Sequence, residues 1–194
     1  MIISFAGPFS FEGAVDAPSV YDVAESRESG VYLWTVPLQN GHLIYYVGET
    51  GVSFGAGLRQ HYRELVAAKY HVYSATEFAR GEKVALWPGY WGDEDGANRK
   101  SKEECRANRE RLSEPIQQMA SILRFFLAPL SCDNRSRQRI KTAITLPLYD
   151  LPGNVGAFQE WLKKHHRRRK DEEPIECITS SPVPLLGLPE RFLA

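Results

Sequence analysis

Two tyrosines and a histidine are the residues of this chain whose types and spacing best suit chemistry. Tyr32 and Tyr46 lie in two neighbouring apolar segments, and His61 follows soon after them. Phenol and imidazole groups can accept or donate a proton at a reacting oxygen. A shared site requires both hydroxyls on one face of the structure. The alternative is that both tyrosines only pack, because tyrosine is common in strands.

The segments that carry the tyrosines read as two strands of a hairpin. "VYLWTV" and "HLIYYV" are rich in β-branched and aromatic residues, and "QNG" between them is a turn signal. A two-residue loop at Asn40-Gly41 would place the tyrosines on opposite faces, because side chains alternate. A three-residue loop over 39–41, or a bulge with the same effect on register, places Tyr32, Trp34 and Tyr46 on one face. We predict the second arrangement.

A helix over residues 53–69 is expected to carry His61. Ser53 is a good N-cap, and Leu58, Tyr62 and Leu65 recur at helical spacing. The other expected elements are a strand within 1–7, one or two helical turns within 17–26, a strand within 82–89, helices over 113–130 (capped by Ser113) and 134–146 (capped by Asn134), a short helix from 157 and a strand within 175–181.

The composition is that of one ordinary globular domain. The 194 residues are 43% hydrophobic and 25% charged, and the formal net charge is zero. A protein without excess positive charge needs a local basic patch to bind nucleic acid.

The cysteines and apolar runs predict a soluble cytoplasmic protein. Cys105, Cys132 and Cys177 lack metal-ligand spacing and read as free thiols in a reducing compartment. We expect no signal peptide and no membrane association, because the longest apolar run, near 125–130, is too short to cross a bilayer.

The strongest basic cluster is "KKHHRRRK" at 163–170. Lys163, Lys164, Arg167 and Arg168 are candidates for contact with DNA phosphates. The acidic residues 171–173 follow at once and weaken the field of the cluster, so a solvated surface segment is the alternative.

The ordered set "GVY" at 30–32, "YVG" at 46–48 and a helix bearing His61 resembles the GIY-YIG nuclease superfamily. The "GET" turn and "SFGAGLRQHYREL" add to it. "GEKVALWPG", "RFFLAPLSCD" and "LGLPE" are similar to bacterial GIY-YIG proteins of about this length. The resemblance therefore covers nearly the whole chain.

The resemblance implies one α/β domain over 1–194, with a core of about 28–150 and a C-terminal extension over 151–194. Its centre would be a three-stranded antiparallel sheet flanked by helices. It also implies a DNA phosphodiesterase that uses Mg²⁺ or Mn²⁺, with Tyr32, Tyr46 and His61 as catalytic residues.

Two positions depart from the family pattern. Gly57 stands where an arginine is expected one helical turn before His61, and Lys141 stands where a metal-binding glutamate is expected. Arg59 and Glu49 are the candidate substitutes. Arg59 and Arg63 are also candidate phosphate contacts, although Arg63 reads more simply as a surface residue.

A lysine at position 141 would place a cation where a metal should bind, which favours phosphate binding without a strong Lewis acid. The sequence thus leaves two functions open. One is a metal-dependent nuclease, and the other is a catalytically impaired relative that binds nucleic acid or a protein partner.

Overall fold

A five-stranded sheet forms the centre of the protein in the computed structural model, which describes residues 1–90, 100–160 and 165–194. The strand order is β2-β7-β3-β4-β9, and only β9 is parallel to its neighbour. The strands are β2 (Ala6–Phe9), β3 (Gly30–Leu38), β4 (Gly41–Thr50), β7 (Arg124–Pro129) and β9 (Leu185–Leu186).

The predicted mixture of helices and strands is confirmed, but the predicted three-stranded central sheet is wrong. Strands β7, β3 and β4 form the antiparallel middle, and β2 and β9 extend it on either side. Both added strands come from short segments near the chain ends. Such segments carry little pattern of their own, and pairing with an edge is what makes them strands.

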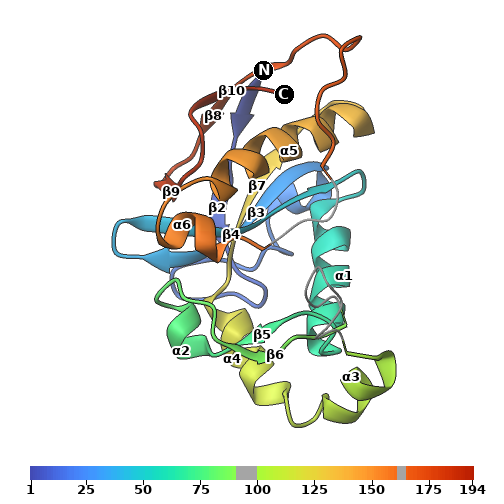
Figure 1. Cartoon of the computed structure of the whole chain (residues 1–194), viewed down its shortest axis with the longest axis vertical. Helices are drawn as coiled ribbons and strands as arrows, with labels where there is room; N and C mark the ends of the chain where they lie inside the picture. Colours follow the sequence, from blue (N-terminus) through green and yellow to red (C-terminus); the bar gives the residue numbers. More distant parts are fainter. Residues whose placement is uncertain (91–99, 161–164) are drawn as a thin grey trace.

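The sheet separates two hydrophobic cores. Helices α1 (Phe54–Val66) and α4 (Ser113–Ile122) pack on the face that includes Tyr32 and Trp34. Helix α5 (Asn134–Tyr149) packs on the opposite face, against Val31 and Leu33. In Figure 1, α5 (orange) crosses the sheet, whereas α1 (cyan) runs beside it towards α3.

Smaller elements complete the structure. A second sheet, in the order β1-β8-β10, contributes to the core on the α5 side, and β5 pairs with β6. These elements are β1 (Ile2–Ser4), the 3₁₀ helix η1 (Ala24–Arg27), β5 (Val72–Tyr73), α2 (Ala75–Phe78), β6 (Ala85–Trp87), α3 (Lys102–Asn108), α6 (Asn154–Phe158), β8 (Glu176–Ser180) and β10 (Arg191–Leu193).

The hairpin has the predicted register near the tyrosines, and a β-bulge rather than a three-residue loop produces it. Leu38 pairs with Gly41, so the loop has two residues and the three-residue loop is wrong. A bulge at Tyr45 then shifts the register, and Trp34 pairs with Tyr46. Because a bulge sets two residues against one, Tyr45 and Tyr46 both lie on the sheet face that includes Tyr32 and Trp34.

The glycines of the two tripeptides are required by close packing. Gly48 lies opposite Tyr32, and a Cβ there would overlap the Tyr32 ring. A Cβ at Gly30 would overlap the carbonyl oxygen of Ala128 on the neighbouring strand. Gly48 therefore lets the Tyr32 ring approach the backbone of β4, and Gly30 lets the backbones of β3 and β7 approach closely.

The helix expected over 113–130 ends at Ile122, and the following residues form β7. A central strand buried on both faces has a continuous apolar run, which its pattern alone does not distinguish from a buried helix. The cap positions also differ by one residue. Leu112 rather than Ser113 precedes α4, and the Asp133 side chain caps α5 by accepting from Ser136 N.

The predicted free thiols are confirmed for all three cysteines. Within the described ranges, no helix has the length and apolar character needed to cross a membrane.

Candidate active site

A chain of hydrogen bonds links Tyr32 on β3 to three residues on and just after α1. The Tyr32 hydroxyl lies 2.7 Å from Nε2 of His61, and Nδ1 of His61 lies 2.7 Å from the Tyr70 hydroxyl. Tyr70 in turn donates to Oε2 of Glu64 at 2.9 Å. The chain therefore connects a strand tyrosine with a carboxylate through a histidine.

The direction of these hydrogen bonds follows from the number of protons. Tyr70 has one hydroxyl proton, which it gives to Glu64, so its oxygen accepts from Nδ1–H of His61. Nε2 of a neutral imidazole is then an acceptor, and Tyr32 donates to it. This arrangement fixes both the tautomer and the ring orientation of His61.

Burial keeps these groups in their neutral forms. It raises the pKa of Tyr32 well above its usual range and raises the pKa of Tyr46 to about 12. Burial also lowers the pKa of His61, which Lys141 lowers further and Glu64 opposes. At neutral pH the site therefore contains phenols and a neutral imidazole.

Tyr32 and Tyr46 lie together, as predicted from the hairpin register. Their ring centroids are 6.2 Å apart, and each ring lies close to His61, at 6.0 and 6.2 Å. Tyr32 is buried, whereas Tyr46 and His61 remain partly exposed. A ligand would therefore meet Tyr46 and His61 before Tyr32.

Lys141 reaches the same site from α5. Its Nζ lies 6.0 Å from the centroid of the Tyr46 ring, within the range of a cation–π contact. Burial lowers the pKa of Lys141, and the nearby Glu49 carboxylate opposes this shift. The residue found at the expected glutamate position thus does point towards the tyrosines.

Arg137 is a second buried cation on α5, which the sequence reasoning missed. Its Nε lies 3.7 Å from Oε2 of Glu49, and Nη1 donates to the carbonyl oxygen of Cys132 at 2.5 Å. Arg137 precedes Lys141 by four residues, so both lie on one side of the helix. The four-residue spacing from Lys141 within the expected helix 134–146 is the sequence signal that could have identified Arg137 as a neighbour of the site.

The remaining candidates on α1 do not enter the site. Gly57 faces the end of β4, where a Cβ would lie 3.4 Å from Oγ1 of Thr50. The guanidinium of Arg59 lies 4.8 Å from the centroid of the Tyr21 ring, away from Tyr32, and Arg63 is exposed. Of the two suggested substitutes, only Glu49 is placed near the tyrosines.

Part of the basic cluster lies beside α5. Lys163 and Lys164 fall outside the described residues, while Arg167 and Arg168 are exposed. The backbone of this segment is attached to α5, because Thr142 Oγ1 accepts from the His166 N–H at 2.8 Å. This contact joins the segment to α5, although neighbouring helix residues such as Lys141 and Thr142 project about 100° apart.

The residues of the site do not fit the divalent metal ion that the resemblance implies. Mg²⁺ and Mn²⁺ prefer oxygen ligands, chiefly carboxylates. Within residues 1–90, 100–160 and 165–194, no three His, Cys, Asp or Glu side chains form a group that could hold a metal. Lys141 takes the expected carboxylate position, and Glu49 already has Arg137 as its ion-pair partner. The use of Mg²⁺ or Mn²⁺ stays a prediction.

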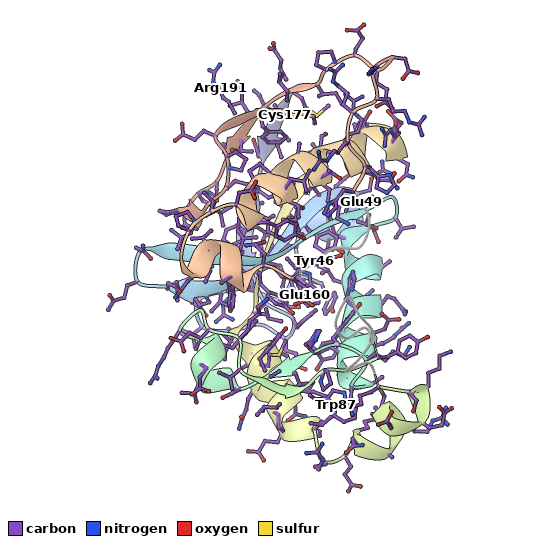
Figure 2. The ribbon with its side chains drawn as sticks, viewed as in Figure 1. Tyr46, Glu49, Trp87, Glu160, Cys177 and Arg191 are labelled. Carbon is purple, nitrogen blue, oxygen red and sulfur yellow. The ribbon has the colours of Figure 1, made fainter. Side chains whose placement is uncertain are left out.

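A pocket opens beside these residues, and Glu160 belongs to its lining. Tyr46 and His61 belong to its lining, together with Trp34, Tyr45 and Tyr70. Figure 2 shows Tyr46 and Glu160 near the centre of the molecule, with Glu49 farther along towards the first turns of α1. Sequence reasoning missed Glu160, because it lies in a segment without regular structure after α6.

Comparisons of the chain with protein-family models, with curated proteins and with solved structures found no match. The class of protein must therefore be argued from the fold and from the geometry of the site.

Proposed function

We propose that this protein is a GIY-YIG-like nuclease that binds one DNA phosphodiester beside Tyr46 and His61 and hydrolyses it. The contact of 2.7 Å between the Tyr32 hydroxyl and Nε2 of His61 is the observation that carries the proposal. The Tyr32 phenol is hydrogen-bonded to a neutral imidazole, which Tyr70 connects to the Glu64 carboxylate. A proton can leave an attacking water along such a chain.

The proposed step uses this path in one direction. As the water oxygen bonds to phosphorus, its proton passes to the Tyr32 oxygen and the Tyr32 proton passes to Nε2 of His61. Glu64 then stabilises the imidazolium through Tyr70. The bond from phosphorus to the leaving oxygen breaks, and that oxygen takes a proton from solvent.

Lys141 supplies the positive charge in this proposal. A phosphodiester carries a negative charge that grows at the transition state, and a preorganised cation in a partly buried site stabilises it. Lys141 Nζ already lies against the Tyr46 ring. The exposed Arg167 and Arg168 would hold neighbouring phosphates, with affinity that falls as salt increases.

A second candidate function is a relative that binds DNA, or a protein partner, without cutting. One observation favours it: Lys141 and Arg137 are two cations in the region where the resemblance implies a metal ion. Without a strong Lewis acid, the leaving oxygen has less stabilisation, so binding can persist while hydrolysis is lost.

One experiment separates the two candidates. Plasmid and linear DNA are incubated with the native protein in Mg²⁺, in Mn²⁺ and in chelator, alongside Tyr32→Phe and the double variant Gly57→Arg/Lys141→Glu. Cutting by the native protein that Tyr32→Phe abolishes supports the nuclease. DNA binding without cutting, with cutting gained only in the double variant, supports the second candidate. Neither binding nor cutting of DNA would overturn the nuclease and the DNA-binding form of the second candidate.

A further inference from the structure

The pocket beside Tyr46 has the aromatic walls of a site for a flat ring and room for more than one water molecule. Its volume is about 80 Å³, whereas a single buried water needs only about 10–15 Å³ measured in this way. Aromatic rings form most of the wall, and Leu65 and Met119 complete it. Tyr46, His61 and Tyr70 are partly exposed, so the pocket reaches the surface at the candidate active site.

The indole N–H of Trp34 is a hydrogen-bond donor without a partner in the described part of the chain. Trp34 is only 4% exposed, and it lines this pocket. Edge contacts with His61 at 5.4 Å and Phe125 at 5.5 Å hold its ring in place. The indole nitrogen is shielded from solvent in this structure. A buried donor without an acceptor costs free energy, so an occupant that displaces a neighbouring side chain and brings an acceptor atom would satisfy it.

Glu160 adds an acceptor to the lining of the pocket. Oε2 of Glu160 accepts from the hydroxyls of Tyr45 at 2.9 Å and Tyr73 at 3.3 Å, and Oε1 lies 3.2 Å from Nδ1 of His71. Burial opposes ionisation, but the bond and charge of His71 keep the pKa of Glu160 below its ordinary value. An ionised carboxylate has about four lone-pair positions, so it can accept another hydrogen bond.

We propose that this pocket binds one unpaired nucleobase of the DNA whose backbone lies at Tyr46 and His61. This inference rests on the proposed function, because Tyr46 and His61 belong to both the pocket and the phosphodiester site. A nucleobase is a flat ring with acceptor and donor atoms on its edge. It matches aromatic walls, the Trp34 N–H and the Glu160 carboxylate.

The consequence is a preference for a particular substrate structure. A base within a duplex is stacked and paired, so it cannot enter a pocket without leaving the helix. A nucleotide that is already unpaired avoids this cost. The protein should therefore bind DNA at a bulged or single-stranded nucleotide in preference to a continuous duplex.

The preference can be measured with three DNA probes of matched length. One is a continuous duplex, one has a single bulged nucleotide, and one has an abasic residue at the bulge, which keeps the phosphate and lacks the base. We expect the bulged duplex to bind the full-length protein about tenfold more tightly than the other two, or about 1.4 kcal/mol, as expected for stacking of one base. Equal affinity for the bulged and abasic probes would overturn the inference.

A fluorescent base tests the location directly in the native protein. With 2-aminopurine at the bulge, binding should change its emission, whereas 2-aminopurine at a paired position should change little. Trp34→Phe keeps an aromatic ring and removes the N–H, so it should reduce the preference several-fold. Trp87→Phe is the matched control, because its N–H bonds to the Ala68 carbonyl outside the pocket. Unchanged emission at the bulge would contradict the proposal even if Trp34→Phe failed to fold.

Failure of this inference can be distinguished from failure of the proposed function. If Lys141→Met weakens binding of all three probes but the bulged and abasic probes bind equally, the pocket proposal fails and the phosphate site stands. If Lys141→Met leaves every affinity unchanged while the bulged probe still binds more tightly than the abasic one, the phosphate role of Lys141 fails and the base pocket stands.

Discussion

Helices α1 and α5 approach the same end of β4 and contribute different kinds of group to the candidate site. From α1 come His61 and Glu64, which Tyr70 links into one hydrogen-bonded chain with Tyr32. From α5 come Lys141 and Arg137, two cations close to Tyr46 and Glu49. In the proposed mechanism, proton transfer and positive charge are carried by separate helices on opposite faces of the sheet, and each can be altered alone.

The most severe test of the α1 side is Tyr32→Phe. The substitution keeps the ring over Gly48 and removes only the hydroxyl that bonds to His61. If the chain of hydrogen bonds carries the proton, DNA cutting should fall by about 10²-fold or more, with DNA affinity nearly unchanged. The control is Tyr62→Phe on α1, whose hydroxyl donates a hydrogen bond to Glu12 at the surface. Equal loss of cutting in both variants would contradict the role of Tyr32.

The matching test of the α5 side is Arg137→Met. Removal of one member of a largely buried ion pair leaves Glu49 without its partner, which should lower the free energy of unfolding by about 3 kcal/mol. The double variant Arg137→Met/Glu49→Gln should recover much of this loss. Urea unfolding measures both. If Glu49→Gln gives no recovery, the two side chains are not coupled and Arg137 stabilises the fold through the Cys132 carbonyl alone.

The pH dependence of stability tests whether His61 is held neutral. Its pKa is lowered below the ordinary 6.5, so the folded protein binds fewer protons than the unfolded chain in the window just below that value. Stability should be greatest above pH 6.5 and should fall as the pH decreases through the window.

The measurement is urea unfolding between about pH 8 and about pH 5. His61→Gln should flatten the profile in part, because burial lowers the pKa of His42 as well and gives the same sign. A profile for His61→Gln that matches the native one would show that His61 is not held neutral by its surroundings.

The smallest effect concerns the glycine on α1 at which the family pattern expects an arginine. A Cβ at Gly57 would lie 3.4 Å from Thr50 Oγ1, which nearly fits, so Gly57→Ala should stabilise the helix by up to about 1 kcal/mol. At Gly55 the Cβ would lie 3.2 Å from the carbonyl oxygen of Ser26, a more rigid neighbour, and the gain should be smaller or absent. Thermal unfolding of both variants checks this. Destabilisation by Gly57→Ala would mean that the space beside Thr50 cannot accept even a methyl group, and therefore cannot accept the larger side chain of Gly57→Arg.

The elements that the sequence predicted correctly are those with local signals. Helix α1 with its Ser53 cap and the single face shared by Tyr32 and Tyr46 follow from periodicity and strand alternation. The bulge at Tyr45 has no clear local signal, and it replaced the expected three-residue loop. The run 124–129 was assigned to a helix because burial on both faces removes the alternation of a strand.

The parts of the site that the sequence did not reveal depend on long-range contacts. Glu160 bonds to Tyr45, which is more than a hundred residues earlier in the chain. Arg137 gains its role only because α5 packs across the end of β4, next to Glu49. Neither contact follows from spacing along the chain, whereas Lys141 could be identified through the family resemblance.

The central claim is that Lys141 holds a DNA phosphate beside the Tyr32–His61 pair. The most direct measurement is DNA affinity over a range of salt concentrations for the native protein and for Lys141→Met, with Arg191→Met, an exposed arginine on β10 of the second sheet, as the control. The account predicts that Lys141→Met weakens binding and reduces the salt slope by about one phosphate contact, while Arg191→Met changes little. An unchanged affinity and slope for Lys141→Met would contradict it.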